Sequence, residues 1–243
     1  MNNSYTLDYT VKYSEVDSNF NLRLDYIVSH FQDITGLHSS EMGIDAQTLL
    51  KKSNAFWVLT KMKLKIERLP RFDEMVEIET WPTTVSAVRF NRDYAIHKDG
   101  KRIIMGASEW CTLDYTDRKI RKTGSICYPH DMPHREDRSG AGEFLKIRET
   151  VCDADYNHTY RSAFVDIDTN KHTNNITYLR MILNCFSPEE FQALKIDALQ
   201  INFISQTFYG DEIVTYKKKI DSGFYIEGQH DGKCVFNCVI LLK

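Results

Sequence analysis

Three short landmarks of the first half of the chain return in the same order in its second half, and this internal repeat constrains the fold more than any other feature. An Asp-x-Asn-x-Asn motif at Asp17 returns as Asp-x-Asn-x-His at Asp168. An Asp-Glu pair and an Asp-Gly-Lys turn also occur twice, the pair at Asp73 and Asp211 and the turn at Asp99 and Asp231. Each match is weak alone, but their shared order favours a duplicated unit whose first copy is longer between its helix and its hairpin.

Each copy is expected to contain a strand, one long helix and then a set of antiparallel strands. Apolar residues at three- and four-residue steps follow Asp17 and again Asn174, which predicts an amphipathic helix at both places. Two-fold alternation in the ranges 58–66, 76–80 and 88–96 predicts half-buried strands, and Asp99-Gly100 is the signal of a tight hairpin. A helix with one apolar stripe must bury it, and the antiparallel sheet is the partner that each copy offers.

The predicted fold class is therefore α+β, with two tandem hotdog units in which a curved antiparallel sheet wraps around a long helix. The two units are expected to pair into one continuous sheet, because pairing covers the edge strand that each would otherwise expose. We place an N-terminal hotdog at residues 1–125, a linker at 126–150 and a C-terminal hotdog at 151–243. The stretch 117–143 suggests this boundary, since it has many charges, several Pro and Gly residues and little periodicity. Its basic start is either a solvated surface or a docking patch, and it contains Arg118, Lys119, Arg121 and Lys122.

Charge and composition exclude several classes of protein. A net charge of -3 argues against a general nucleic-acid binder, which needs a dominant basic surface. No apolar run approaches the ~20 residues that span a bilayer, and the N-terminus shows no basic-then-apolar segment, so we expect a cytoplasmic protein without membrane contact. The six cysteines are scattered and form no Cys-x-x-Cys pair, so we expect reduced thiols, no metal site and no cofactor.

The residues that favour chemistry lie in the polar run 166–175, directly before the second amphipathic helix. Asp168, Asn170 and His172 are the candidate catalytic residues of this run. The first backbone N–H groups of a helix have no partner within the helix and favour negative charge, including the oxyanion that forms when a carbonyl is attacked. The alternative is an Asx-rich turn with Asn174 as the N-cap, which needs no chemistry. The copies differ here, because Asn21 is the counterpart of His172 and only His172 titrates near neutral pH.

These residues resemble a known family, the acyl-acyl carrier protein thioesterases of bacteria and plant plastids. The resemblance covers nearly the whole chain, and its most specific part is Asp168-x-Asn170-x-His172-x-Asn174-Asn175. The other matching residues are Trp57-Val58, Thr80-Trp81, Arg89, Ser108-x-Trp110 and the stretch from Asp114 to Arg118.

The resemblance implies a double hotdog enzyme that hydrolyses fatty acyl-acyl carrier protein thioesters to free fatty acid in fatty acid biosynthesis. Asp168, Asn170 and His172 would be catalytic, and the first hotdog would hold the acyl chain. Asn174, Asn175 and Trp57 are the candidate substrate-binding residues, although a tryptophan on a half-buried strand more often fills space in the core. Acyl carrier protein would be the partner, and the protein itself a monomer or homodimer.

The chain departs from the family pattern at one place. Many members have a further catalytic Glu a few residues before the next Asp, and here that position holds Gln206, which can act neither as a base nor as a carboxylate nucleophile. Plant members follow that Glu with a Cys, whereas this chain has Thr207. Gln206 could still orient a water molecule or donate a hydrogen bond to the thioester oxygen.

The resulting hypothesis is that His172, or Asp168 through it, takes a proton from the attacking water while helix N–H groups stabilise the oxyanion. Two other functions stay open. The fold also hosts dehydratases that act on hydroxyacyl thioesters. A non-catalytic acyl-thioester binder is the second alternative, and Gln206 is the best sequence argument for it.

Overall fold

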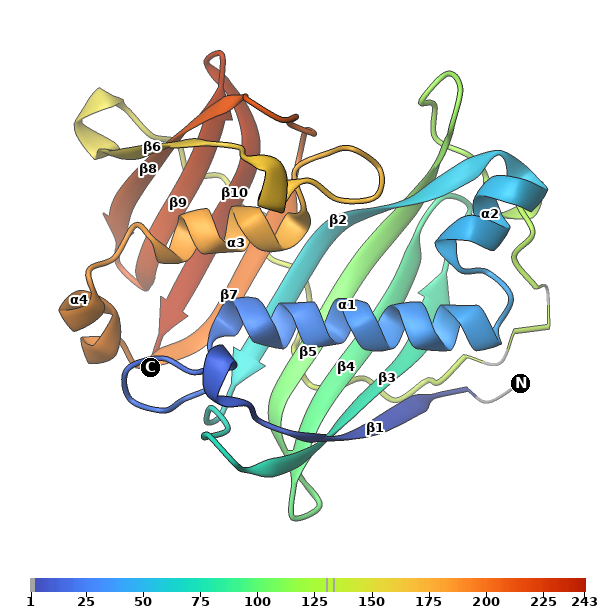
Figure 1. Cartoon of the computed structure of the whole chain (residues 1–243), viewed down its shortest axis with the longest axis horizontal. Coiled ribbons are helices and arrows are strands. Elements are labelled where there is room, and N and C mark those ends of the chain that lie inside the picture. The colour runs from blue at the N-terminus through green and yellow to red at the C-terminus, as the bar shows by residue number, and fades with distance from the viewer. Residues whose placement is uncertain (1–2, 130, 133) are drawn as a thin grey trace. The chain divides into compact units, whose positions relative to one another are not determined.

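The computed structural model describes residues 3–129, 131–132 and 134–243, and it divides the chain into two compact units, Met1–Gly142 and Glu143–Lys243. Both units are built from antiparallel strands and a few helices, which confirms the α+β class predicted from the sequence. Figure 1 shows these elements with their labels.

The first unit contains an antiparallel sheet with the strand order β1-β3-β4-β5-β2. Its strands include those predicted by two-fold alternation, and its long helix begins at Leu24, where the apolar pattern begins. The elements are β1 (Tyr5–Thr10), the 3₁₀ turn η1 (Tyr13–Glu15), α1 (Leu24–Glu41), α2 (Ala46–Ser53), β2 (Ala55–Ile66), β3 (Met75–Val85), β4 (Phe90–Lys98), β5 (Lys101–Asp114) and η2 (Thr123–Ser125).

The second unit repeats the same succession in a shorter form. Its strand order is β7-β10-β9-β8-β6, and all pairs are antiparallel. The elements are η3 (Asp153–Asp155), β6 (Tyr156–Arg161), η4 (Phe164–Asp166), α3 (Asn175–Leu183), α4 (Pro188–Ala193), β7 (Ile196–Phe203), β8 (Glu212–Ile220), β9 (Gly223–His230) and β10 (Lys233–Leu242).

In each unit the long helix packs on one face of its own sheet, as Figure 1 shows for α1 and α3. Phe31 of α1 stacks on Tyr94 of β4 with a centroid distance of 4.5 Å. Tyr178 of α3 packs on Phe236 of β10 at 5.4 Å. The Phe236 ring fills the space above Gly228, where a Cβ atom would lie only 2.1 Å from Cε1 of that ring. The apolar stripe predicted on each helix is therefore buried against the sheet.

Both Asp-Gly landmarks form the hairpins that the sequence predicts. Asp99 and Gly100 join β4 to β5 with φ values of 51° and 72°. Asp231 and Gly232 join β9 to β10 with φ values of 49° and 70°. Two successive positive φ angles are the backbone conformation of a type I′ turn, and Asp-Gly is one of the pairs that adopt it at low cost.

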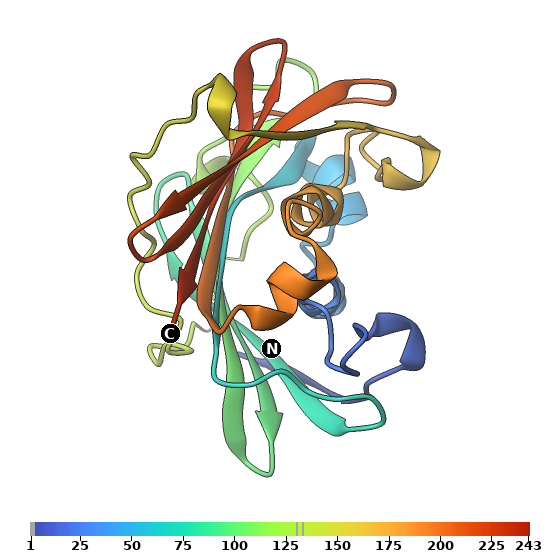
Figure 2. The same cartoon turned by 90° about the vertical axis from the view of Figure 1, so that its left-hand side faces the viewer.

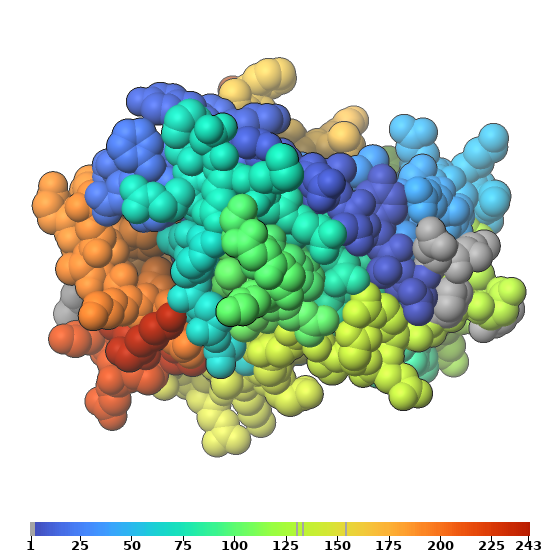
Figure 3. All heavy atoms as spheres, turned by 90° about the horizontal axis from the view of Figure 1, so that it is seen from below, coloured from blue at the N-terminus to red at the C-terminus, as the bar shows by residue number. Residues whose placement is uncertain are grey.

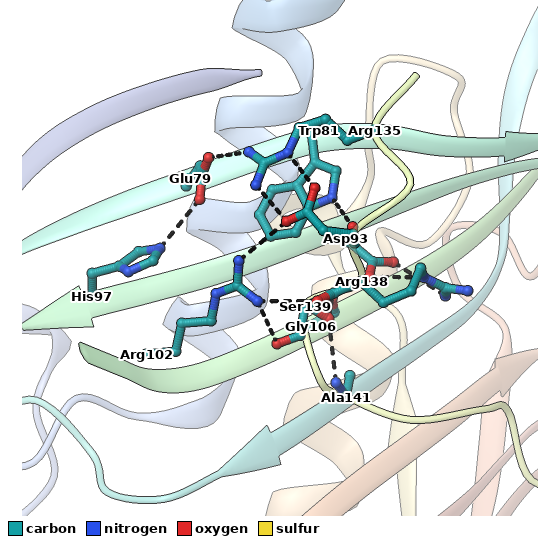
Figure 4. Close-up of polar contacts among 11 residues, drawn as sticks. Glu79, Trp81, Asp93, His97, Arg102, Gly106, Arg135, Arg138, Ser139 and Ala141 are labelled. Atoms are coloured by element: carbon teal, nitrogen blue, oxygen red, sulfur yellow. Dashed lines mark hydrogen bonds and ion pairs between the residues drawn. The ribbon is translucent and has the colours of Figure 1, made fainter. Parts of the chain in front are cut away.

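Residues 135–141, part of the stretch expected to be a linker, pack against the other face of the first unit's sheet. Asp93 neighbours Tyr94 on β4, so it points away from α1. Its carboxylate accepts hydrogen bonds from Ser139 N–H at 2.7 Å and from Arg138 Nε at 3.0 Å, as drawn in Figure 4. In Figure 2 the same segment runs on the side of the strands away from α1, and Figure 3 shows its lime-green atoms against the green atoms of the strands.

A second contact holds the continuation of this segment on the second unit. The side-chain amide of Gln200 on β7 accepts a hydrogen bond from Leu145 N–H at 2.7 Å and donates one to Leu145 O at 3.0 Å. This pair of bonds imitates one rung of a β-ladder. Among the described residues, no helix is long and apolar enough to cross a membrane.

Gly228→Ala is expected to lower the free energy of unfolding by about 1–3 kcal/mol, because the new methyl group overlaps the fully buried ring of Phe236. Urea denaturation monitored by circular dichroism measures this change. Gly124→Ala is the control, since a Cβ atom there meets nothing within 4 Å. Equal stability of the two variants would show that the ring can move aside freely.

Candidate active site

The Asp-x-Asn-x-His loop is folded around one oxygen of the Asp168 carboxylate. Oδ1 of Asp168 accepts hydrogen bonds from the backbone N–H groups of Asn170 at 2.8 Å and His172 at 3.1 Å. The Asp168 N–H in turn donates to His172 O at 2.8 Å. Lys171 lies at the tip with φ of 65°, a left-handed conformation that the short loop requires. Asp168 therefore determines the path of the backbone through the motif.

The loop at Asp17 in the first copy has the same geometry. Oδ1 of Asp17 accepts from Asn19 N–H at 2.8 Å and Asn21 N–H at 2.9 Å, and the Asp17 N–H donates to Asn21 O at 2.8 Å. The first copy has no imidazole in this loop, yet the carboxylate makes the same contacts. The position of the aspartate is thus explained by loop structure in both copies.

Asn174 caps helix α3, as the turn interpretation of the sequence proposed. Its Oδ1 accepts a hydrogen bond from Ile176 N–H at 2.9 Å, and Asn175 is the first residue of the helix. The N–H of Asn174 donates to Asp166 O at 2.7 Å. Asn170 is exposed on the loop that precedes the cap. The geometry of a capped turn is therefore present at the start of α3.

A backbone hydrogen bond joins the two loops that carry His172 and Gln206. The N–H of Thr173 donates to Thr207 O at 2.8 Å, and each of these threonines directly follows one of the two candidate residues. The His172 side chain is largely buried, and its ring meets Phe208 edge-on at a centroid distance of 5.3 Å. Gln206 is half-buried on the adjoining loop.

Trp57 lies in the first unit, in surroundings typical of a core. Its Nε1 donates to Ile44 O at 2.8 Å, and its ring meets Phe90 edge-on at 4.8 Å. It packs against a buried apolar cluster formed by Met42, Ile44, Phe90, Tyr128 and Met132. A role in substrate binding stays a prediction for this residue.

The sequence analysis missed a buried chain of four hydroxyl groups beside this loop. Thr173 Oγ1 lies 2.9 Å from Ser162 Oγ and accepts a hydrogen bond from Thr207 Oγ1 at 2.8 Å. The Tyr178 hydroxyl lies 2.8 Å from Thr207 Oγ1 and accepts from Thr207 N–H at 3.1 Å. All four side chains are at most 3% exposed, and burial raises the pKa of Tyr178. We call these four residues the hydroxyl chain.

Comparison of the two copies would have identified the hydroxyl chain, since the hydrogen bonds of their backbones correspond. Leu22 N–H donates to Pro70 O at 2.8 Å, as Thr173 N–H does to Thr207 O. The counterparts of Ser162, Thr173, Thr207 and Tyr178 are Val11, Leu22, Pro70 and Ile27, all apolar and buried.

The same bonds correct one detail of the repeat. Gly210 N–H donates to Ser162 O at 2.9 Å as Asp73 N–H donates to Val11 O at 3.0 Å. Asp73 therefore corresponds to Gly210 and not to Asp211. The pairing of the strands determines which residues correspond, and the shared Asp-Glu sequence does not.

Three of the four basic residues after Thr116 contact their own neighbours. The Arg118 guanidinium lies over the ring of Phe56 at 4.9 Å, and Arg121 pairs with Asp114 at 2.8 Å. Lys119 pairs with Asp117 at 3.0 Å. These contacts favour the solvated surface over a docking patch. In the described part of the chain, no three His, Cys, Asp or Glu side chains are grouped to hold a metal ion.

Two family models match the chain in order. The acyl-ACP thioesterase N-terminal domain matches residues 2–125, and the acyl-ACP thioesterase C-terminal domain matches residues 150–242. The chain belongs to the acyl-ACP thioesterase family. The resemblance that the motif residues suggested is thereby confirmed.

Similar proteins include plant plastid enzymes and solved bacterial and plant structures. The oleoyl-acyl carrier protein thioesterases of Coriandrum sativum and Arabidopsis thaliana (thioesterase 1) are 21% and 24% identical over 86% and 80% of this chain. The chain spans 61% and 59% of their lengths.

Among solved structures, an acyl-ACP thioesterase from Bacteroides thetaiotaomicron has a TM-score of 0.85 and 24% identity, covering 99% of this chain and 98% of its own. The 12:0-ACP thioesterase from Umbellularia californica has a TM-score of 0.88 and 14% identity, covering 100% of this chain and 98% of its own. These similarities show that this acyl-ACP thioesterase family member shares their fold.

Thr207→Val is expected to lower the free energy of unfolding by about 1–3 kcal/mol, because it leaves the hydroxyl groups of Thr173 and Tyr178 in a dry site with one partner fewer. The measurement is urea denaturation of the purified protein. Thr159→Val on β6 serves as the control, since Thr159 is exposed and its change should stay within about 0.5 kcal/mol. If Thr207→Val were as stable as that control, the Thr207 hydroxyl would not contribute to the free energy of unfolding.

Proposed function

We propose that this protein hydrolyses the thioester that links a fatty acyl chain to acyl carrier protein, releasing free fatty acid and carrier protein. The observation that carries the proposal is the in-order match of both family domains, together with an imidazole and an amide on two loops that a backbone hydrogen bond joins just before α3. Membership of the family makes hydrolysis the best-supported reaction of this site.

Under this proposal the two units act as tandem hotdogs with different roles. The second unit, placed at residues 151–243 in the sequence analysis, carries the reacting groups. The first, placed at 1–125, holds the acyl chain. This division is supported by the divergence of the copies, because Asn21 and Leu69 stand in the first copy where His172 and Gln206 stand in the second. A pair of apolar and amide side chains cannot move a proton at neutral pH.

His172 acts as the general base in the proposed mechanism and removes a proton from the attacking water. Asp168 acts through the backbone, since its Oδ1 is occupied by the two N–H groups that shape the loop. The amides of Asn170 and Gln206 orient the water and the thioester oxygen, and Asn174 and Asn175 lie where the oxyanion would meet the start of the helix. A leaving thiolate needs little protonation, so no strong acid is required.

His172→Ala is expected to leave the protein folded and to lower kcat by about 10²–10⁴-fold, the usual contribution of a general base. The assay measures free fatty acid released from a panel of acyl carrier protein substrates of different chain lengths. Formation of an enoyl product by the unmodified protein would identify a dehydratase instead. Tight binding of the same substrates without any turnover would identify a non-catalytic binder.

The role of Asp168 is tested by comparing two substitutions of the same side chain. Asp168→Asn keeps an oxygen that accepts both backbone N–H groups, so it should retain most of the turnover, whereas Asp168→Ala loses the loop and lowers kcat by about 10²-fold. Asp17→Asn and Asp17→Ala are the matched controls, since they change the same contacts in the first copy. If Asp168 carried the proton, Asn and Ala would be equally harmful.

A further inference from the structure

We propose that the hydroxyl chain Ser162–Thr173–Thr207–Tyr178 is a positioning device that fixes His172 relative to Gln206. This inference rests on the proposed thioesterase function and adds four residues to its site. None of the four hydroxyl groups touches the substrate in this proposal, so they act through the two residues that they position.

The fold of these loops does not require the hydroxyl groups. In the first copy Val11, Leu22, Pro70 and Ile27 occupy the four places, and the backbone contact between the loops is unchanged, with a distance of 2.8 Å from Leu22 N to Pro70 O. An apolar set of side chains thus supports the same local structure. Since burying hydroxyl groups brings no hydrophobic gain, their presence in the second copy alone points to a function.

Two donors of the chain are given by its geometry: Thr207 N–H donates to the Tyr178 hydroxyl, and Thr207 Oγ1 donates to Thr173 Oγ1. Because Thr207 gives its only hydroxyl proton to Thr173, the Tyr178 hydroxyl is the donor in its bond to Thr207 Oγ1. Thr173 and Ser162 share the last bond, in which either hydroxyl can donate. Proline at position 70 has no N–H to donate, so the chain cannot start in the first copy. A buried network of this kind, in which each hydroxyl group has at least one partner, favours one arrangement of its members.

The chain ties together the two residues that follow the candidate catalytic groups. Thr173 follows His172 and Thr207 follows Gln206, and the two threonines share both a backbone hydrogen bond and a hydroxyl hydrogen bond, each 2.8 Å long. Two bonds between the same residues restrict sliding and twisting of one loop against the other. In the first copy, Leu22 and Pro70 share the backbone bond but have no hydroxyl groups to form the second one. The imidazole and the carboxamide are thereby held in a fixed register.

This arrangement also accounts for Thr207 at a place where plant members of the family have Cys. The Thr207 side chain is fully buried, and its hydroxyl makes hydrogen bonds to both Thr173 and Tyr178. It is therefore shielded from any substrate and committed to structure. Its contribution to activity is geometric, through Gln206 and His172.

The experiment removes all four hydroxyl groups at once and compares stability with turnover. The variant combines Ser162→Ala, Thr173→Val, Thr207→Pro and Tyr178→Phe, in imitation of the first copy, and a second version carries Thr207→Val in case proline is not tolerated. Urea unfolding and the kinetics of acyl carrier protein thioester hydrolysis are measured for both versions, for Thr207→Val alone and for the unmodified protein.

We expect the hydroxyl-free protein to be more stable than Thr207→Val alone but less active than the unmodified protein. The hydroxyl-free protein should unfold at a higher urea concentration than Thr207→Val alone, because removing every partner leaves fewer unpaired groups. Its kcat should nevertheless fall by about 10- to 100-fold with little change in KM, the result of a small misplacement of reacting groups. Added to His172→Ala, the four substitutions should cause a smaller further loss than in the unmodified protein, because one of the two residues through which they act is already removed.

The control is Tyr225→Phe, which removes another buried tyrosine hydroxyl of the second unit, one that donates to Glu227. It should change stability and leave kcat unaltered. Three results would overturn the positioning role and leave the hydrolase function intact. They are full kcat in the hydroxyl-free protein, an equal loss of kcat in Tyr225→Phe, and an undiminished further loss of kcat on the His172→Ala background. Absence of thioester hydrolysis by the unmodified protein would overturn the proposed function itself, so the unmodified protein is assayed first.

Discussion

One carboxylate oxygen in each unit determines how the chain enters its long helix. Oδ1 of Asp168, like Oδ1 of Asp17, accepts the N–H groups two and four residues further on and so closes a loop directly before the helix. The cap, the helix direction and the packing of the helix on the sheet all follow from where this loop ends. Charge-assisted hydrogen bonds to backbone N–H groups are strong enough to hold such a short loop.

The second unit repeats this framework with different side chains at several of its positions. The contacts that shape the loop are equal in both copies, and the differences are concentrated in side chains that the framework does not use. His172 replaces an amide, and buried hydroxyl groups replace Val11, Leu22, Pro70 and Ile27. Polar groups in a dry interior must be fully paired to be tolerated, and the second copy pairs them with one another. The catalytic proposal therefore builds on a scaffold that already existed.

The sequence was sufficient for the elements and for part of the site. Hydrophobic periodicity located α1, α3 and several strands of the first copy, and Asp-Gly located both hairpins, because these signals are local. Asp168, His172 and Gln206 were also named, but the occupation of the Asp168 carboxylate by its own loop was not foreseen. The hydroxyl chain was missed because Ser162, Thr173 and Thr207 meet across loops that are far apart in sequence. Such meetings depend on strand pairing, which periodicity does not specify, and the same lack shifted one landmark of the repeat from Gly210 to Asp211.

The segment between the two units is fastened at both of its ends. Asp93 holds it at Ser139, and the amide of Gln200 holds it again at Leu145. A polypeptide must detach over many residues before a protease can thread it, and ordinary connectors do so readily. Here only five residues, 140–144, lie between the two anchors at Ser139 and Leu145. The joint left by the duplication is thus expected to be as durable as the domains it connects, and a poor place for nature to insert new sequence.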